Sequence, residues 1–152
     1  MEVPYGATKQ SLYFMLTDST TGARKTGVAH TAVTGSYCRN QGSRVAITMA
    51  NLAAANSVWA SGGWEEIDAV NQPGLYRFDV PNAAFTFGTD ADDQPVTTVE
   101  VTVTATGAHS ETKEIELTYP IITQGTIGAT INNQPTFTEH TMLDGTVRKD
   151  YL

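Results

Sequence analysis

Cysteine and basic residues are scarce in this 152-residue chain. Its single cysteine, Cys38, excludes an intramolecular disulfide, and a cysteine-based zinc site would have to use three widely separated histidines. Only 16% of the residues are charged, and nine lysines and arginines stand against sixteen acids, for a net charge of −7. Clustered basic side chains for phosphate binding are therefore hard to build, and we expect no nucleic-acid partner.

Long hydrophobic runs are also missing. No window is apolar enough to cross a bilayer, and the N-terminus does not pair a basic stretch with an apolar one. We therefore expect neither a signal peptide nor a membrane anchor, and synthesis in a reducing cytoplasm. A hydrophobic content of 40% is enough to form a core, and the length is that of one ordinary domain.

Alternation of apolar and polar residues is the dominant pattern, and it predicts β-strands. The valines at 99, 101 and 103 share one face of a strand, opposite threonines and Glu100. Residues 114–119 alternate in the same way after a short connection containing Gly107, so the two runs are predicted to form an antiparallel hairpin. Further strands are expected at residues 12–16, 31–39, 44–49 and 64–67, and from Leu75 or Tyr76 onward.

Two segments allow more than one interpretation. The alanine-rich residues 49–57 are either a short helix or a turn that bridges two strands. Pro73 and Gly74 are expected to set a turn before the next strand. The spacing of Gly74 and Tyr76 is similar to the tyrosine corner of immunoglobulin-like sandwiches, in which the hydroxyl binds upstream backbone; the alternative is a strand aromatic after an ordinary turn.

The pattern changes at Pro120. Glycine, asparagine and proline then interrupt every apolar stretch, so no regular period persists, yet more apolar side chains remain than a solvated tail needs. We predict a short N-terminal arm (residues 1–9), a β-sandwich domain (10–119) and an extended C-terminal arm (120–152) that orders against a partner. The predicted partner-binding residues are Ile121, Ile122, Ile127, Ile131, Phe137, Met142, Leu143, Val147 and Tyr151.

Two acidic clusters are candidates for a metal-binding or catalytic site. Asp90, Asp92 and Asp93 could supply oxygen ligands to calcium, but Pro95 and Val101 stand where an EF-hand loop needs glycine and glutamate. We interpret this cluster as a solvated acidic loop. Glu65, Glu66 and Asp68 are interpreted as surface charges, because neighbouring strand residues point to opposite faces.

The other reactive side chains form no catalytic motif. His30, His109 and His140 lie in separate loops or arms, without a nucleophile elbow or a metal-binding histidine pair. We expect Cys38 to be a small buried thiol rather than a reactive one. No catalytic residue, cofactor or metal site is predicted, and we expect the chain not to be an enzyme.

Trp59 and Trp64 flank a Ser-Gly-Gly turn and have two interpretations. Exposed, they could stack on sugar rings; buried, they would fill the core, as large aromatic side chains usually do. We expect at least one of them to lie in the core.

The run from Val58 to Pro81 resembles a module that recurs in structural proteins of tailed bacteriophages. The similarity rests on Val58-Trp59, on the Gly-Gly-Trp-Glu-Glu-Ile-Asp-Ala run at residues 62–69, and on the Asn-Gln-Pro-Gly-Leu-Tyr-Arg-Phe-Asp-Val-Pro run at 71–81. It extends over roughly residues 12–119. The resemblance implies an all-β fold, a single immunoglobulin-like antiparallel β-sandwich, and carries over no catalytic residue.

Among such proteins, one bare domain with apolar arms looks most like a capsid decoration or cement protein. The resemblance implies a virion protein made in the host bacterial cytoplasm, bound to the major capsid protein or other virion proteins, and forming a homo-oligomer within the particle. The alternatives are a neck, tail or baseplate component, or a carbohydrate-binding host-adhesion module using Trp59, Trp64 and Tyr76.

Overall fold

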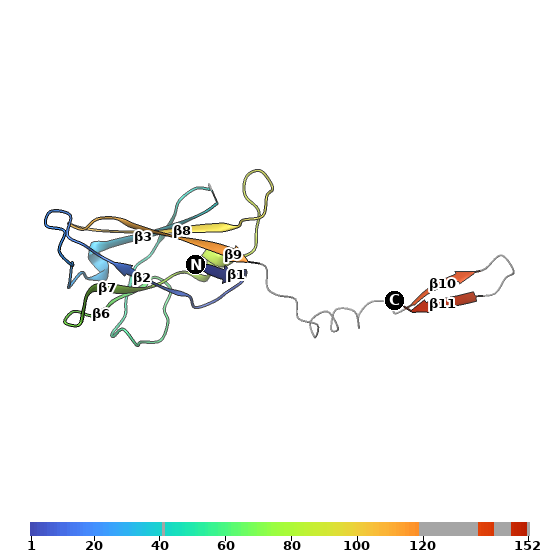
Figure 1. Ribbon diagram of the computed structural model, residues 1–152, viewed down its shortest axis with the longest axis horizontal. Helices are drawn as coiled ribbons and strands as arrows, with labels where there is room; N and C mark the ends of the chain where they lie inside the picture. Colours follow the sequence, from blue (N-terminus) through green and yellow to red (C-terminus); the bar gives the residue numbers. More distant parts are fainter. Residues whose placement is uncertain (41, 119–136, 142–146, 152) are drawn as a thin grey trace. The chain divides into compact units, whose positions relative to one another are not determined.

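The computed structural model describes residues 1–40, 42–118, 137–141 and 147–151, with side chains described for the first two ranges. The chain divides into two compact units, residues 1–119 and 120–152, and each is described by itself. Regular structure in the described part of the first unit consists of nine strands and two short 3-10 turns, η1 (His30–Ala32) and η2 (Asn82–Phe85). The first unit is an all-β sandwich of two sheets, as the alternation predicted (Figure 1).

The larger sheet has five strands, and the smaller sheet has four. The five-stranded sheet runs in the order β1 (Glu2–Pro4), β9 (Glu111–Thr118), β8 (Thr98–Ala105), β3 (Val33–Arg39) and β4 (Val45–Ile47). The four-stranded sheet runs in the order β2 (Ser11–Met15), β7 (Gln72–Asp79), β6 (Gly63–Asp68) and β5 (Ala50–Asn51).

Side chains from both sheets meet in one hydrophobic core. The three valines of β8 are fully buried, on the face that the alternation assigned to them. The β8 and β9 strands pair antiparallel across the predicted turn. At the centre of the core, the Trp64 and Tyr76 rings stack with their centroids 4.7 Å apart, and Phe78 packs edge-on against Trp64.

The predicted N-terminal arm is instead part of the sandwich. Strand β1 pairs parallel to β9, and Val3 is buried between the exposed Glu2 and Pro4. The amide of Tyr5 continues this contact by donating to the carbonyl of Thr118. A strand of three residues is too short for alternation to reveal, so the prediction of an arm at residues 1–9 was wrong for this part.

The turn before β7 also lies elsewhere than predicted. It occupies residues 69–71, and Pro73 and Gly74 lie within β7. Gly74 has φ +77°, and a Cβ at this position would lie 2.8 Å from the Leu16 carbonyl oxygen, so glycine is required. A register irregularity between Glu66 and Asp68 on β6 accommodates this bend.

The Tyr76 hydroxyl binds upstream backbone, but not in a local corner. It donates to the Lys25 carbonyl at 3.0 Å and accepts from the Val28 amide at 2.9 Å. These partners lie 51 and 48 residues upstream, in the loop between β2 and β3. Tyr76 therefore holds the β2–β3 loop in place, and the expected bond of its hydroxyl to upstream backbone is present, with partners much farther along the chain than in the corner of immunoglobulin-like sandwiches.

The second unit contains an antiparallel hairpin of β10 (Phe137–Thr141) and β11 (Val147–Tyr151). Its register places Phe137 opposite Tyr151 and Glu139 opposite Lys149. The segment predicted as an extended arm therefore contains two short strands, which the sequence analysis did not foresee. The Asp144-Gly145 dipeptide between the strands is a strong hairpin signal that the sequence contained.

Two further expectations concern helices. Residues 49–57 form no helix: β5 takes the first part, and turns follow. Within the described ranges, no helix has the length and apolar character needed to cross a membrane.

Candidate functional site

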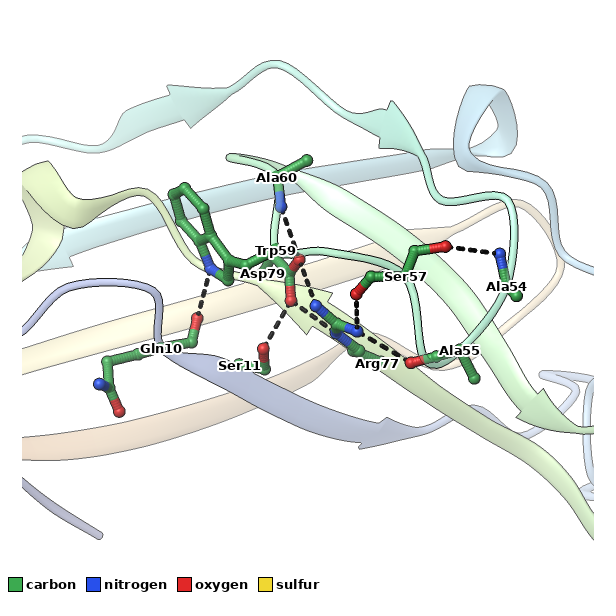
Figure 2. Close-up of polar contacts among 9 residues, drawn as sticks. All are labelled: Gln10, Ser11, Ala54, Ala55, Ser57, Trp59, Ala60, Arg77 and Asp79. Atoms are coloured by element: carbon green, nitrogen blue, oxygen red, sulfur yellow. Dashed lines mark hydrogen bonds and ion pairs between the residues drawn. The ribbon is translucent and has the colours of Figure 1, made fainter.

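A buried ion pair lies on the outer face of the four-stranded sheet. Tyr76 and Phe78 point into the core, so Arg77 and Asp79 of β7 alternate to the opposite face. Both are nevertheless buried. The Arg77 guanidinium donates from Nε and Nη2 to the two Asp79 carboxylate oxygens, at 2.8 and 2.9 Å, and Ser11 Oγ donates to the same carboxylate at 2.6 Å (Figure 2).

The loop of residues 52–62 covers this pair. Arg77 Nη1 donates to the carbonyl oxygens of Ala55 and Ser57, at 2.8 and 2.9 Å. Asp79 accepts from the Ala60 amide at 3.0 Å, so both ions of the pair hold the loop. Figure 2 shows these bonds converging on the loop from the strand beneath it. The ion pair therefore clamps an irregular segment onto a regular sheet.

Contacts within the loop fix its shape further. Ala54 and Ser57 exchange two hydrogen bonds, one through the serine hydroxyl. The Trp59 indole N–H donates to the Gln10 carbonyl at 3.2 Å, which ties the loop to the segment before β2. At the end of the loop Gly62 has φ +77°, and a Cβ there would lie 2.0 Å from the Thr48 carbonyl oxygen. These ties leave the loop little conformational freedom.

The outer surface of the loop is uncharged and partly apolar. Val58 is 86% exposed, and the nearby Ala53, Ala54 and Asn56 are also exposed. No charged residue occurs anywhere between Val45 and Trp64. A rigid, neutral loop with an apolar tip suits binding by shape and apolar contact, because little conformational entropy is lost on association.

The acidic loop at residues 90–93 has a structural role. Asp90 accepts the Asn40 side-chain amide at 2.8 Å and the backbone amides of Asp92 and Gln94. The bond from Asn40 is the main reason that the pKa of Asp90 is lowered, and the backbone amides add to it. Asp93 has φ +57°, as asparagine and aspartate in turns tolerate. The interpretation as an acidic loop fits these contacts better than a calcium site.

Two of the three acids at 65–68 also hold turns. Glu66 accepts the backbone amides of Gly27 and Gly74, at 2.8 and 2.9 Å. Asp68 accepts from Asn71, through its side chain and its backbone, and from the Val70 amide, and these bonds lower the pKa of Asp68. Among the residues with described side chains, no group of three or more histidine, cysteine, aspartate or glutamate residues could hold a metal ion.

The thiol of Cys38 is partly buried, on β3. Its sulfur lies 3.3 Å from Glu100 Oε2. Burial and the neighbouring carboxylate both raise the pKa of Cys38, which suppresses the thiolate form. Among the histidines, His30 belongs to η1, His109 to the connection between β8 and β9, and His140 to β10 of the second unit.

The aromatic side chains proposed as a sugar platform are mainly core residues. Trp64 and Tyr76 are buried, and the Trp64 indole donates to the Val28 carbonyl at 2.9 Å. The expectation that at least one tryptophan lies in the core is confirmed. Trp59 is partly exposed, but its N–H is bonded to Gln10, so a three-ring platform of Trp59, Trp64 and Tyr76 does not exist.

Most of the predicted partner-binding residues cannot be placed. Phe137 lies in β10, and Val147 and Tyr151 lie in β11, without described side chains. The other six predicted residues, Ile121, Ile122, Ile127, Ile131, Met142 and Leu143, lie outside the described part of the chain.

Comparison with known proteins gives no significant match: no family model, curated protein or solved structure matches the chain.

The loop of residues 52–62, which the Arg77–Asp79 pair holds and which we call the clamped loop, was not predicted from the sequence. Two signals pointed to it: opposite charges two residues apart within an otherwise apolar strand, at Arg77 and Asp79, and twenty consecutive residues without charge. The first indicates an ion pair on one strand face, and the second indicates a neutral surface. Neither says that the two lie together, because the bonds from Arg77 to Ala55 and Ser57 span about twenty residues of chain.

Proposed function

We propose that this chain is a non-enzymatic structural protein of a phage virion, of the capsid decoration or cement type. In this proposal the sandwich is the body and the C-terminal segment attaches it to the major capsid protein or to another virion protein. One observation carries the proposal: residues 120–152 form a unit separate from a sandwich that already has a core of its own.

The described residues of the second unit form two strands. Two strands alone are marginally stable in water, and three or more strands, or packing against another element, are needed for independent stability. The hairpin also leaves both outer strand edges without a described pairing partner in its sheet. A strand or surface supplied by a partner would complete it, as in recognition by strand addition.

The finer assignment of the sandwich as immunoglobulin-like belongs to the same proposal. The order β9-β8-β3 corresponds to strands G-F-C of that fold, and β2-β7-β6 corresponds to B-E-D. Strand β1 then occupies the place of an N-terminal strand paired parallel with G. This correspondence supports the resemblance to phage modules noted at residues 58–81.

A neck, tail or baseplate protein would attach through the same C-terminal segment. Identifying the virion protein that this segment binds would therefore distinguish these locations from the capsid shell. The sugar-binding alternative lacks its platform, because Trp64 and Tyr76 are buried.

Shortening the chain tests the proposal. A chain that ends at Tyr119 should keep nearly the thermal midpoint of the full chain, because the core lies within residues 1–119. It should lose most of its binding to particles of the same phage, measured by co-sedimentation. Loss of folding with binding retained, or full binding by the shortened chain, would contradict the proposal.

A charge exchange within the hairpin provides a finer control. Glu139→Lys places two lysines opposite each other in the hairpin register and should weaken particle binding by a few fold. The double change Glu139→Lys with Lys149→Glu restores an opposite-charge pair and should restore binding.

A further inference from the structure

The segment from Val45 to Trp64 is unusual in this acidic protein. It contains no charged residue in twenty positions, where the overall charged fraction of 16% leads one to expect about three. The flanking residues 29–44 and 65–119 hold eleven acids and four bases. We call residues 45–64 the neutral segment.

The neutral segment forms one edge of each sheet. Strand β4 is the last strand of the five-stranded sheet, and β5 is the last strand of the four-stranded sheet. The clamped loop then continues from β5 across Arg77 and Asp79. Two open edges and one rigid loop thus come from one stretch of chain.

These edges lack the usual protection against pairing. Natural edge strands commonly carry lysine, other charges or proline, which discourage association with another sheet. Here the exposed residues include Val45 and Ala46 on β4, and Val58 on the loop. Short strand length is the remaining safeguard, since β4 has three residues and β5 has two.

The acidic side chains gather on other strands. On the five-stranded sheet, Glu2 lies opposite Glu116, and Glu100 lies opposite Glu114. A basic partner would be attracted to that face. The neutral segment suits a partner that is itself acidic, since it lets two negative bodies approach with the least repulsion.

We propose that the neutral segment is the contact between two copies of this chain. Every copy carries the same acidic body and the same neutral segment, so two copies can meet through their neutral segments without bringing like charges into contact. This inference does not depend on how the C-terminal segment binds a particle, and it supplies the copy-to-copy contact that a multi-copy shell component needs.

Salt dependence distinguishes this contact from one between opposite charges. Added salt screens the repulsion between the two acidic bodies, so self-association should strengthen as ionic strength rises. An acidic-to-basic contact would weaken under the same change.

Two exposed valines provide a matched test. Val58 is 86% exposed on the clamped loop, and Val70 is 84% exposed in the turn between β6 and β7. Sedimentation velocity of the full chain over a concentration series should detect association. Val58→Glu should weaken it by about tenfold or more, equivalent to about 1.4 kcal/mol, because two like charges meet at the contact. Val70→Glu makes the same chemical change and should leave it unaltered.

Val45→Glu, on the β4 edge, is the second variant, and circular dichroism checks that each variant folds. The inference is overturned if the full chain stays monomeric at high concentration and high salt. It is also overturned if Val58→Glu and Val70→Glu behave alike, or if the chain ending at Tyr119 no longer associates. The last result would assign association to the C-terminal unit.

Discussion

At the scale of single residues, the Arg77–Asp79 pair is the most consequential feature. Removing two charges from water costs several kcal/mol per ion, and only good geometry with further hydrogen bonds offsets that cost. Here the contact is bidentate, and Ser11, Ala60, Ala55 and Ser57 satisfy further donors and acceptors. Such a pair contributes little net stability while intact, but removing one partner leaves the other charge buried and unpaired.

Asp79→Asn should therefore destabilise the domain by about 3 kcal/mol, measured by urea unfolding. Hydrogen exchange should accelerate at the Ala60 amide, which loses its charged acceptor. Lys25→Met, which breaks the partly exposed pair with Asp18, is the control and should have a much smaller effect. Equal losses for the two variants would show that the buried pair does not hold the loop.

Single residues were predictable only where their partners are close in sequence. The acidic loop at Asp90 was recognised, and its bonds to Asp92 and Gln94 are local, but its partner Asn40 lies 50 residues away and was not foreseen. Asp68 was interpreted as a surface charge, so its turn with Val70 and Asn71 was not foreseen either. Tyr76 was singled out, but its partners in the β2–β3 loop were not, because no local rule selects an acceptor 51 residues away.

At the scale of elements, the five-stranded sheet carries an electrostatic conflict on its outer face. Glu100 of β8 and Glu114 of β9 are directly opposite, as are Glu2 of β1 and Glu116 of β9. Like charges directly opposite each other on neighbouring strands destabilise a sheet. The two opposed glutamate pairs therefore lower the stability of the five-stranded sheet.

Glu114→Gln should raise the free energy of unfolding by about 0.2–1 kcal/mol, because it removes one of the two opposed charges. The gain should be largest at low ionic strength, where screening is weakest. Glu65→Gln is the matched control, since Glu65 lies opposite Arg77 in the β6–β7 register. The control should give no gain, and a gain of equal size in both variants would contradict the argument.

Element predictions succeeded in proportion to strand length. The eight-residue strands β8 and β9 repeat the two-residue period often enough to be read from sequence. Strands β1 and β5 have three and two residues, so their existence depends on the neighbours that they pair with. Strand β7 begins earlier than expected because Gly74 bends within it and Pro73 lies before the bend.

At the scale of the whole molecule, stability should fall in acid. Hydrogen bonds lower the pKa values of three aspartates: Asp18 chiefly through Lys25, Asp68 through Asn71 and Asp90 through Asn40. The unfolded chain then takes up protons at a higher pH than the folded one, so stability increases with pH in this range. The contribution is present above about pH 4 and is lost as pH falls through the lower folded values.

Thermal midpoints measured from pH 6 to pH 2 should therefore fall below about pH 4. Asp90→Asn should reduce this dependence, because one of the depressed groups is gone. An unchanged pH profile in that variant would mean that Asp90 does not contribute to the acid sensitivity.

The fold class followed from the sequence because alternation records which face of each strand is buried. The division of the chain near residue 119 also coincides with the change of pattern at Pro120. The hairpin of the second unit was missed because its strands contain only one and two apolar residues, too few to show an alternating pattern. The function stays a proposal, since a binding surface leaves no catalytic motif and its partner is a different molecule.

The pairing of β1 with β9 has a mechanical consequence. The chain leaves the sandwich through the end of β9, which would be an edge strand if β1 were absent. Strand β8 pairs with residues 111–116 of β9, and β1 pairs with its last three residues, so the end of β9 lies between two strands. A pull on the C-terminal segment along the strand direction therefore loads two ladders at once in shear, instead of peeling one ladder open bond by bond. The first residues of the chain thus reinforce the point from which its last residues would transmit tension.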